Sequence, residues 1–204
     1  KQVEEKERKC TGIVFSGSLR LGDSITDCAS GTINTVREIL ISDQTAEIAS
    51  AGQAITLFLE HKGQITSRDI ITKSDAPTQE TDQFAAHLLW VHADPLLPER
   101  KYIIKIGNQT VLAAVTDLKY RLNFDTLEHM ASKTLAHNEL AYCNFAVEEP
   151  IRFDAYDNVK KTGAFILLDR FTNSIMGYGF ITFALRRATN LTWHKLSIDK
   201  QTRA

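Results

Sequence analysis

Gly177 and Gly179 lie in the stretch GAFILLDRFTNSIMGYGF, residues 163–180, which comes closest in this chain to a phosphate-binding motif. A dinucleotide cradle needs a further glycine three positions after Gly179 and then a helix, so that backbone amides reach the phosphates. Position 182 is Thr182, and the sequence continues with β-branched and aromatic residues. The P-loop sequence Gly-Lys-Ser or Gly-Lys-Thr is also missing. We therefore predict a β-hairpin in which the two glycines allow close packing.

Metal binding needs ligands that converge, and the histidines of this chain are poorly spaced for it. His87 and His92 are five apart on a predicted strand, so they face opposite sides of it. His129 and His137 are eight apart on a predicted helix, about two turns, which is too far to chelate one ion. Because no cysteine neighbours a histidine, we predict no metal site and interpret all six histidines as surface or hydrogen-bonded residues.

The candidate nucleophiles also lack partners in the sequence. Ser16 and Ser18 do not fit the Gly-x-Ser-x-Gly spacing of a nucleophile elbow, and we interpret them as turn residues. Cys143 lies in a strand-like run without a nearby base, which predicts a small buried hydrophobe. Glu148 and Glu149 are adjacent on a strand and point to opposite faces. We therefore assign no catalytic, cofactor-binding or metal-binding residue in this chain.

Two further possibilities concern residues far apart in the sequence. Arg186 and Arg187 near Trp193 could contact a phosphate and a base, but two arginines make a weak patch, and a solvated strand end is favoured. A stand-alone enzyme site formed by distant residues stays an open alternative that no spacing supports. The residues considered for such a site are Asp169, His137 and Cys143.

The composition is that of a globular protein with ordinary charge. The 204 residues allow one large domain or two smaller ones, and 43% hydrophobic residues are enough for a packed core. The 24 Lys and Arg balance 25 Asp and Glu, so no overall field attracts nucleic acid or a membrane surface. The longest apolar stretches, about eight residues, are too short to span a bilayer. Three scattered cysteines suit a reducing compartment, and we expect a cytoplasmic protein.

Short runs of β-branched residues separated by glycine turns predict an all-β fold. The stretch 72–81 is polar and contains Pro77, which marks a domain boundary candidate. Pro95 and Pro98 predict a loop after the strand at 83–93, and Gly107-Asn108 predicts a reversing turn. Only the segment 125–137 has a helical period, with Asp125 as its cap, and it predicts one short helix.

Three runs of the sequence resemble the large, GTPase subunit of bacterial sulfate adenylyltransferase, most closely the bifunctional form fused to adenylylsulfate kinase. They are LPERKYIIKIGNQTVLAAVTDLKYRL, TLEHMASKTLAHNELAYCNFAVEEPIRFDAY and TGAFILLDRFTNSIMGYGFITFALRRATN. The segments TGIVFSGSLRLGDSI and AGQAITLFLE are similar to the second domain of that subunit, a barrel shared with elongation factor Tu. The resemblance runs from Cys10 to Lys200.

The resemblance implies two consecutive closed antiparallel β-barrels, similar to domains 2 and 3 of elongation factor Tu. Residues 1–76 would form the first, with an N-terminal strand poorly matched by KQVEEKERK, and residues 77–187 the second. Residues 188–204 resemble the connector towards a kinase domain. The family's GTPase domain would precede residue 1 and the kinase domain would follow residue 204, so the resemblance implies a piece of a longer enzyme. Ser67-Arg68-Asp69 stands where the family usually has Arg-Gly-Asp, so Arg68 occupies a position that is often glycine in the family.

The implied full-length activity is sulfate activation, in which ATP and sulfate give adenylylsulfate and pyrophosphate. The implied partners are the small catalytic subunit, the upstream GTPase domain and the downstream kinase domain, with no nucleic acid and no membrane. GTP, ATP and Mg are expected for the full-length protein, at sites outside this chain. The barrels would couple GTP hydrolysis to the small subunit without catalysis of their own. The alternative is a barrel pair of a translational GTPase that binds RNA or the ribosome, because the motif at 11–25 fits both families.

Overall fold

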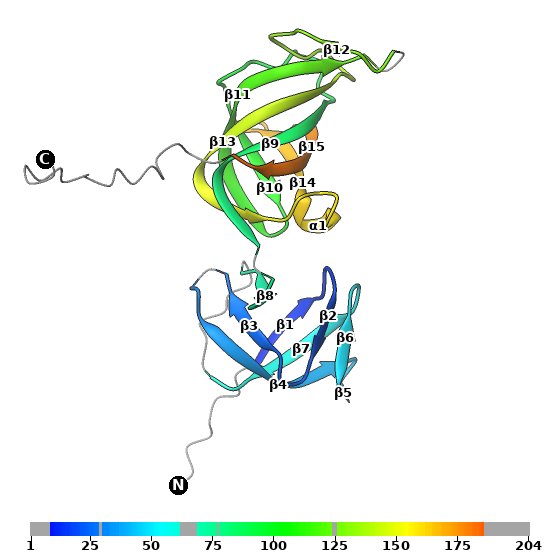
Figure 1. The fold of residues 1–204 in the computed structure, drawn as a ribbon. Coiled ribbons are helices and arrows are strands. Elements are labelled where there is room, and N and C mark those ends of the chain that lie inside the picture. Colours follow the sequence, from blue (N-terminus) through cyan, green and yellow to red (C-terminus); the bar gives the residue numbers. More distant parts are fainter. Residues whose placement is uncertain (1–8, 29, 62–68, 77, 124–125, 186–204) are drawn as a thin grey trace, which may run out of the picture.

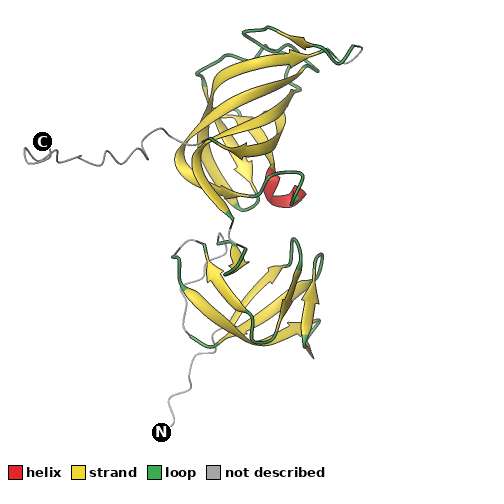
Figure 2. Ribbon diagram, in the orientation of Figure 1, coloured by secondary structure: helices red, strands yellow, loops and turns green. Residues whose placement is uncertain are grey.

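The computed structural model describes residues 9–28, 30–61, 69–76, 78–123 and 126–185. These residues form strands almost throughout, as expected for an all-β chain (Figure 2). The strands before residue 76 are β1 (Lys9–Ile13), β2 (Ser18–Arg20), β3 (Ser24–Asp27), β4 (Ile33–Ile41), β5 (Gln44–Ala46), β6 (Ile48–Ser50), β7 (Ala54–Leu59) and β8 (Ile71–Lys73). The later elements are β9 (Gln79–Trp90), β10 (Lys101–Ile106), β11 (Gln109–Leu122), β12 (His129–Met130), β13 (Leu140–Phe153), α1 (Lys160–Gly163), β14 (Ala164–Asp169) and β15 (Ile175–Ala184).

The later strands close into a barrel. The sheet runs in the order β10-β14-β15-β9-β13-β11, and β10 also pairs with β11, which completes a ring of six antiparallel strands. Figure 1 shows this barrel in green to orange, with β12 attached to the outer end of β11. The expectation of a closed antiparallel barrel is confirmed for this part of the chain. Closure removes free strand edges, so every strand of the ring has a hydrogen-bonded neighbour on both sides.

The barrel interior is filled by large side chains from alternate strand positions. Phe84 stacks on Phe145 with ring centroids 5.2 Å apart, and Phe165 stands edge-on to both rings. Trp90 is fully buried and donates its indole N–H to the Asp94 carbonyl oxygen at 2.8 Å. A packed aromatic core of this kind makes the barrel a rigid body.

The first eight strands form a smaller unit with its own core. Its main sheet has the order β1-β7-β4-β3-β8, with β5 paired to β4, and β2 and β6 form a separate two-stranded ribbon. The core consists of Ile25, Val36, Ile39, Ala49, Ile55, Leu57 and Leu59. Within residues 9–28, 30–61 and 69–76, no ladder joins β1 to β8. The expected closed ring of hydrogen bonds is therefore not seen in this unit, because the chain divides into a sheet and a ribbon of three-residue strands.

The predicted helix over 125–137 is wrong in its described part, residues 126–137. Leu127 has a φ of 57°, which a right-handed helix cannot accommodate, and residues 129–130 form strand β12. Leu127 is 70% exposed whereas Leu135 is fully buried in the barrel core, so the expected common apolar face does not exist. Leu135 is held by a hydrogen bond from the Leu96 amide to its carbonyl oxygen. The contacts of this segment with the barrel stabilise it more than a helix with the same apolar period would.

Other local predictions are confirmed. β10 and β11 form a hairpin whose two-residue turn is Gly107-Asn108, and Gly107 has a φ of 53°. Residues 91–100, which contain Pro95 and Pro98, form no strand. The described residues contain the short helix α1, which immediately precedes β14. No helix in the described ranges is long and apolar enough to cross a bilayer.

Candidate functional site

The stretch 163–180 is a hairpin, as predicted. β14 and β15 pair antiparallel, with Phe165 opposite Gly179 and Leu167 opposite Gly177. A Cβ atom added at Gly179 would lie 2.0 Å from the Phe165 ring, and one at Gly177 would lie 2.6 Å from the Leu89 carbonyl oxygen. Thr182 continues β15 and starts no helix. The glycines therefore permit close packing inside the barrel and do not line a phosphate cradle.

The turn between β14 and β15 is organised by Asp169. One of its carboxylate oxygens accepts hydrogen bonds from the amides of Phe171 at 2.8 Å and Thr172 at 2.9 Å. The other oxygen forms an ion pair with Arg100, on the neighbouring loop. The Thr172 and Phe171 amides, together with Arg100, hold the pKa of the Asp169 carboxyl below its usual range. Asp169 is thus an ionised structural residue, with one carboxylate oxygen used within the turn and the other used by Arg100.

The same turn presents an aromatic and a cation to solvent, which the sequence reasoning missed. Phe171 is 76% exposed, and the Arg170 guanidinium lies 5.0 Å from the centre of its ring. Leu97 and Ile175, on the adjoining loop and strand, are also exposed. Phenylalanine and arginine held on a rigid turn are typical of a protein contact, and they offer no acid or base for catalysis.

The three residues considered for a stand-alone enzyme site have separate surroundings. Cys143 is fully buried in the barrel core, where burial raises the pKa of its thiol to about 12, so the thiolate is not available at neutral pH. The Nδ1 atom of His137 lies 2.9 Å from the Val91 carbonyl oxygen. Asp169 is engaged in its own turn. The prediction that Cys143 is a buried hydrophobe is confirmed. Each of the three residues has different neighbours, so they do not form a common site.

Three further histidines, His87, His92 and His129, do not converge on a common site. His87 lies in β9, whereas His92 follows the end of that strand. The prediction that the two histidines share a strand is therefore wrong. His129 is not on a helix; it lies in β12 and stacks on Tyr120 with ring centroids 3.7 Å apart. No group of three or more His, Cys, Asp and Glu side chains that could hold a metal ion occurs in the part of the chain that the structure describes.

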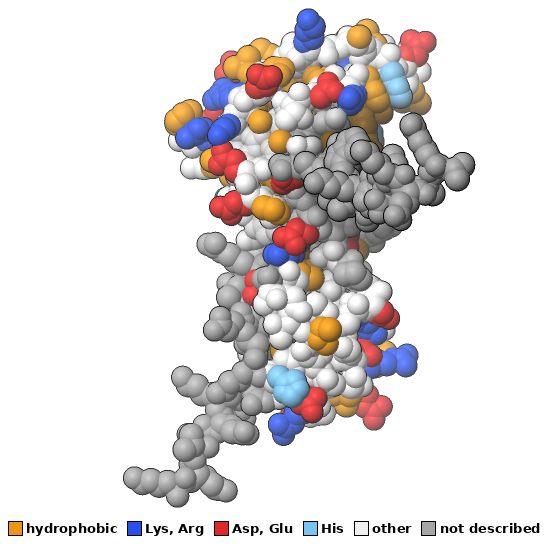
Figure 3. Space-filling view, turned by 60° about the vertical axis from the view of Figure 1, so that its left-hand side comes forward, with side chains coloured by type: hydrophobic (Ala, Val, Ile, Leu, Met, Phe, Trp, Pro, Cys, Tyr) orange, Lys and Arg blue, Asp and Glu red, His pale blue; other side chains and the backbone are white. Residues whose placement is uncertain are grey.

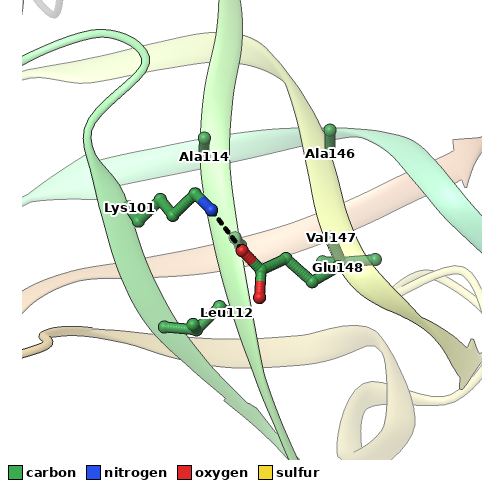
Figure 4. Close-up of a pocket in the computed structure, with 7 residues that line it drawn as sticks. Lys101, Leu112, Ala114, Ala146, Val147 and Glu148 are labelled. Atoms are coloured by element: carbon green, nitrogen blue, oxygen red, sulfur yellow. Dashed lines mark hydrogen bonds and ion pairs between the residues drawn. The ribbon is translucent and has the colours of Figure 1, made fainter.

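A shallow hollow lies on the outer side of β10, β11 and β13. Lys101, Ala114 and Ala146 are register neighbours across these strands, and the small alanines leave a cavity of about 160 Å³ (Figure 4). Lys101 and Glu148 form an ion pair at its edge. The other lining residues are Leu112, Ala113 and Val147. The hollow is therefore lined by one exposed ion pair and by apolar side chains, and none of these is a catalytic acid, base or nucleophile.

Charged side chains of both signs are mixed on the face that Figure 3 shows. Figure 3 shows Lys, Arg, Asp and Glu side chains of both signs interspersed on the visible side of the molecule. Several are paired across strands, among them Lys73 with Asp23 and Arg152 with Glu80. Arg186, Arg187, Ser67, Arg68 and the expected connector 188–204 lie outside the described residues. The described residues on this face lack the concentrated positive charge that a phosphate-rich partner selects.

Comparison with protein families and solved structures gives the fold its context. Residues 83–182 match the family described as GTP-eEF1A C-terminal domain-like. The structure of sup35 complexed with GDP is similar with a TM-score of 0.76, covering 87% of this chain and 44% of that one, at 14% identity. Elongation factor SelB from Methanococcus maripaludis is similar with a TM-score of 0.72, covering 90% of this chain and 41% of that one, at 21% identity. These matches establish the translation-factor-like fold.

Similarity in sequence points to a different group of proteins. The bifunctional enzyme NodQ of a Rhizobium species is 40% identical over 97% of this chain and 30% of its own length. The bifunctional enzyme CysN/CysC of Xylella fastidiosa is 36% identical over 97% of this chain and 32% of its own length. Sulfate adenylyltransferase subunit 1 of Shewanella woodyi is 36% identical over 83% of this chain and 36% of its own length. This chain is therefore a homologue of NodQ, CysN/CysC and sulfate adenylyltransferase subunit 1, and it spans about a third of their length.

Proposed function

We propose that this chain is the barrel region of a sulfate-activating enzyme, the large subunit of a GTP-dependent sulfate adenylyltransferase. The observation that carries the proposal is 36–40% identity over 97% of the chain to NodQ and CysN/CysC. That identity is well above the 14% and 21% found for the translation factors of the same fold. In the complete protein, ATP and sulfate would give adenylylsulfate and pyrophosphate, and a fused kinase would phosphorylate the product.

Within that enzyme, the chain acts as a mechanical coupler. Six strands close the second barrel without a free edge, and its core is packed by aromatic rings, so it can move as one rigid body. A GTPase domain on one side and the small subunit on the other would be linked by the shift of this body. GTP, ATP and Mg would bind in the other parts of the enzyme, since no described residue here forms a nucleotide cradle or metal cluster. We assign residues 1–76 and 77–187 to the two barrels and 188–204 to the connector.

The mechanical role can be tested by exchange. The barrel region of the Shewanella woodyi subunit 1 is replaced by this chain, and pyrophosphate release is followed with the small subunit, ATP, sulfate and GTP. The proposal expects GTP-stimulated release. The matched control carries the corresponding barrels of the Methanococcus maripaludis SelB, which share the fold but not the sequence. Equal activity of the two exchanges, or none with this chain, would contradict the proposal.

A second experiment addresses the chain alone. Mixed with small subunit, ATP and sulfate, the chain is expected to give no GTP-stimulated pyrophosphate release, and such release would refute its non-catalytic role. The alternative of a translation-factor barrel pair predicts binding to RNA that weakens steeply with salt. A binding titration at two salt concentrations separates the two functions, because a sulfate-activating coupler has no need of phosphate contacts.

A further inference from the structure

The turn between β14 and β15 holds an aromatic side chain out in solvent. At 76% exposure, Phe171 is the most exposed large apolar side chain in the described residues, and Leu97 and Ile175 are exposed as well. Leu97 belongs to the same end of the barrel, because its amide donates at 3.2 Å to the hydroxyl of Tyr102, the register partner of Asp169. Ile175 begins β15 directly after the turn. We call this set the distal patch; its members are Leu97, Arg170, Phe171 and Ile175.

The backbone of this turn is fixed before any partner binds. The Asp169 amide donates to the Ser174 carbonyl oxygen at 2.9 Å, and the Asn173 amide donates to the Asp169 carbonyl oxygen at 3.0 Å. Asn173 has a φ of 56°, a left-handed conformation that asparagine adopts more readily than most residues. The Phe171 amide is held by the Asp169 carboxylate at 2.8 Å. A side chain on a preorganised backbone loses less entropy on binding than one on a mobile loop.

Arg170 supplies a positive charge that the barrel does not neutralise. Residues 78–123 and 126–185 contain four arginines. Three of them are paired with a carboxylate on another segment, and these are Arg100, Arg121 and Arg152. Arg170 has no ion pair within those two ranges, and its guanidinium lies 5.0 Å from the centre of the Phe171 ring. Since Asp169 is already used by Arg100 and two amides, Arg170 can pair with a carboxylate of a partner.

These features select a protein partner that has an apolar pocket with a carboxylate at its rim. Aromatic residues and arginine are enriched at protein interfaces. Nucleic acid binding requires several unpaired cations, whereas the distal patch has one, Arg170. A second copy of this chain is disfavoured, because a two-fold contact centred on Phe171 would bring the two Arg170 side chains together.

The position of the distal patch fits the small subunit of the proposed enzyme. β9 starts next to the smaller unit at Gln79 and ends at Trp90, whose register partner Gly177 lies near the turn (Figure 1). The patch therefore lies at the end of the barrel that is remote from the smaller unit. A rigid body transmits a shift through contacts at opposite ends. Resting on the function proposed above, we propose that the small subunit docks on the distal patch, receives Phe171 in an apolar pocket and pairs a carboxylate with Arg170.

Calorimetric titration of the full chain with the small subunit of the Shewanella woodyi enzyme tests this docking. Phe171→Ser should weaken binding about thirtyfold or more, as for loss of a buried aromatic anchor. Arg170→Ala should reduce the salt dependence of the affinity, because it removes the charge that pairs with the partner. The matched control is Phe183→Ser, which removes an exposed phenylalanine of β15 outside the patch and should leave the affinity unchanged. Thermal unfolding of each variant should match the parent, because all three side chains are exposed.

The outcomes separate this docking from the proposed function. If the parent binds the small subunit and Phe171→Ser binds equally well, the docking proposal is overturned and the proposed function stands. An equal loss of affinity for Phe183→Ser also overturns it, since the effect would not be specific to the patch. If the parent itself does not bind the small subunit, the docking fails together with the proposed coupling.

Activity of the exchanged enzyme gives a second readout. In the Shewanella woodyi subunit 1 that carries this chain, Phe171→Ser should raise the small-subunit concentration for half-maximal pyrophosphate release by about thirtyfold or more. The GTP-stimulated rate at saturating small subunit should not change. Loss of GTP stimulation at saturation would instead place the patch against the GTPase domain, and self-association that Phe171→Ser abolishes would place it against a second copy. Either result overturns the proposal.

Discussion

The substitution Gly179→Ala tests the packing of the second barrel. The alanine Cβ would lie 2.0 Å from the Phe165 ring, whereas ordinary contacts of a Cβ begin at 3.4 Å. The ring must therefore move by roughly 1.4 Å. It has no room to do so, because Phe84 and Phe145 hold it edge-on at centroid distances of 5.8 and 5.3 Å.

The expected cost follows from that overlap. Overpacking of a close-packed core costs about 1–3 kcal/mol, and we expect the upper part of that range, about 2–3 kcal/mol, because three rings must rearrange together. For a barrel of about 100 residues this lowers the melting temperature by roughly 10–20 °C. Phe165→Leu removes part of the obstacle, so the double variant Gly179→Ala/Phe165→Leu should lose about 1 kcal/mol less than the sum of the single variants.

The assay is thermal and urea unfolding followed by Trp90 emission, in a Trp193→Phe background so that one tryptophan reports. Trp90 is fully buried in the second core and therefore follows that barrel alone. Gly12→Ala in β1 is the matched control, because a Cβ there meets nothing within 4 Å and the Trp90 transition should not move. An unchanged melting temperature for Gly179→Ala, or strict additivity with Phe165→Leu, would refute the packing argument.

Three further outcomes follow from single residues. The pKa of Asp169 is lowered in the folded protein, so the ionised carboxylate stabilises the fold at pH values above the ordinary aspartate pKa of about 4. This stabilisation is lost as the pH falls through the folded pKa. Asp169→Asn should therefore weaken the loss of stability at acidic pH, as measured by unfolding followed through Trp90 emission. Cys143, with a pKa of about 12, should resist thiol reagents at pH 8 until the barrel unfolds, as checked by mass spectrometry in denaturant; modification of the folded protein would contradict its placement. Lys101→Ala should change stability by less than about 1 kcal/mol, because its ion pair with Glu148 is exposed, and a larger loss would show that the hollow depends on it.

Local sequence signals predicted the elements whose geometry is itself local. The Gly107-Asn108 turn and the β14–β15 hairpin were predicted correctly, because a two-residue turn and a polar break between apolar runs act over a few residues. The helix at 125–137 was not, because its apolar period competes with contacts from distant residues. Leu135 enters the core of the barrel, and Thr134 donates its hydroxyl to the Leu96 carbonyl oxygen at 2.5 Å.

The alignment of aromatic side chains on the outside of the second barrel was beyond sequence reasoning for a related reason. Tyr120, Tyr142, His87 and Phe180 are separated pairwise by 22 to 93 residues along the chain, and no spacing connects them. Only the register of β11, β13, β9 and β15 aligns them in one row. A shift of one residue in any strand would turn its ring into the core.

The sequence by itself determined that the chain is β-rich, that it lacks a P-loop and a dinucleotide cradle, and that it is related to sulfate-activating proteins. These properties depend on residue type, short spacing and identity along the chain. The tertiary structure decided that six strands close into one ring, that Asp169 is held by its own turn and by Arg100, and that aromatic side chains of four strands align on the outside of the barrel. Closure and register are cooperative properties of strands far apart in sequence, because each pairing is stabilised only when its neighbours are already in place.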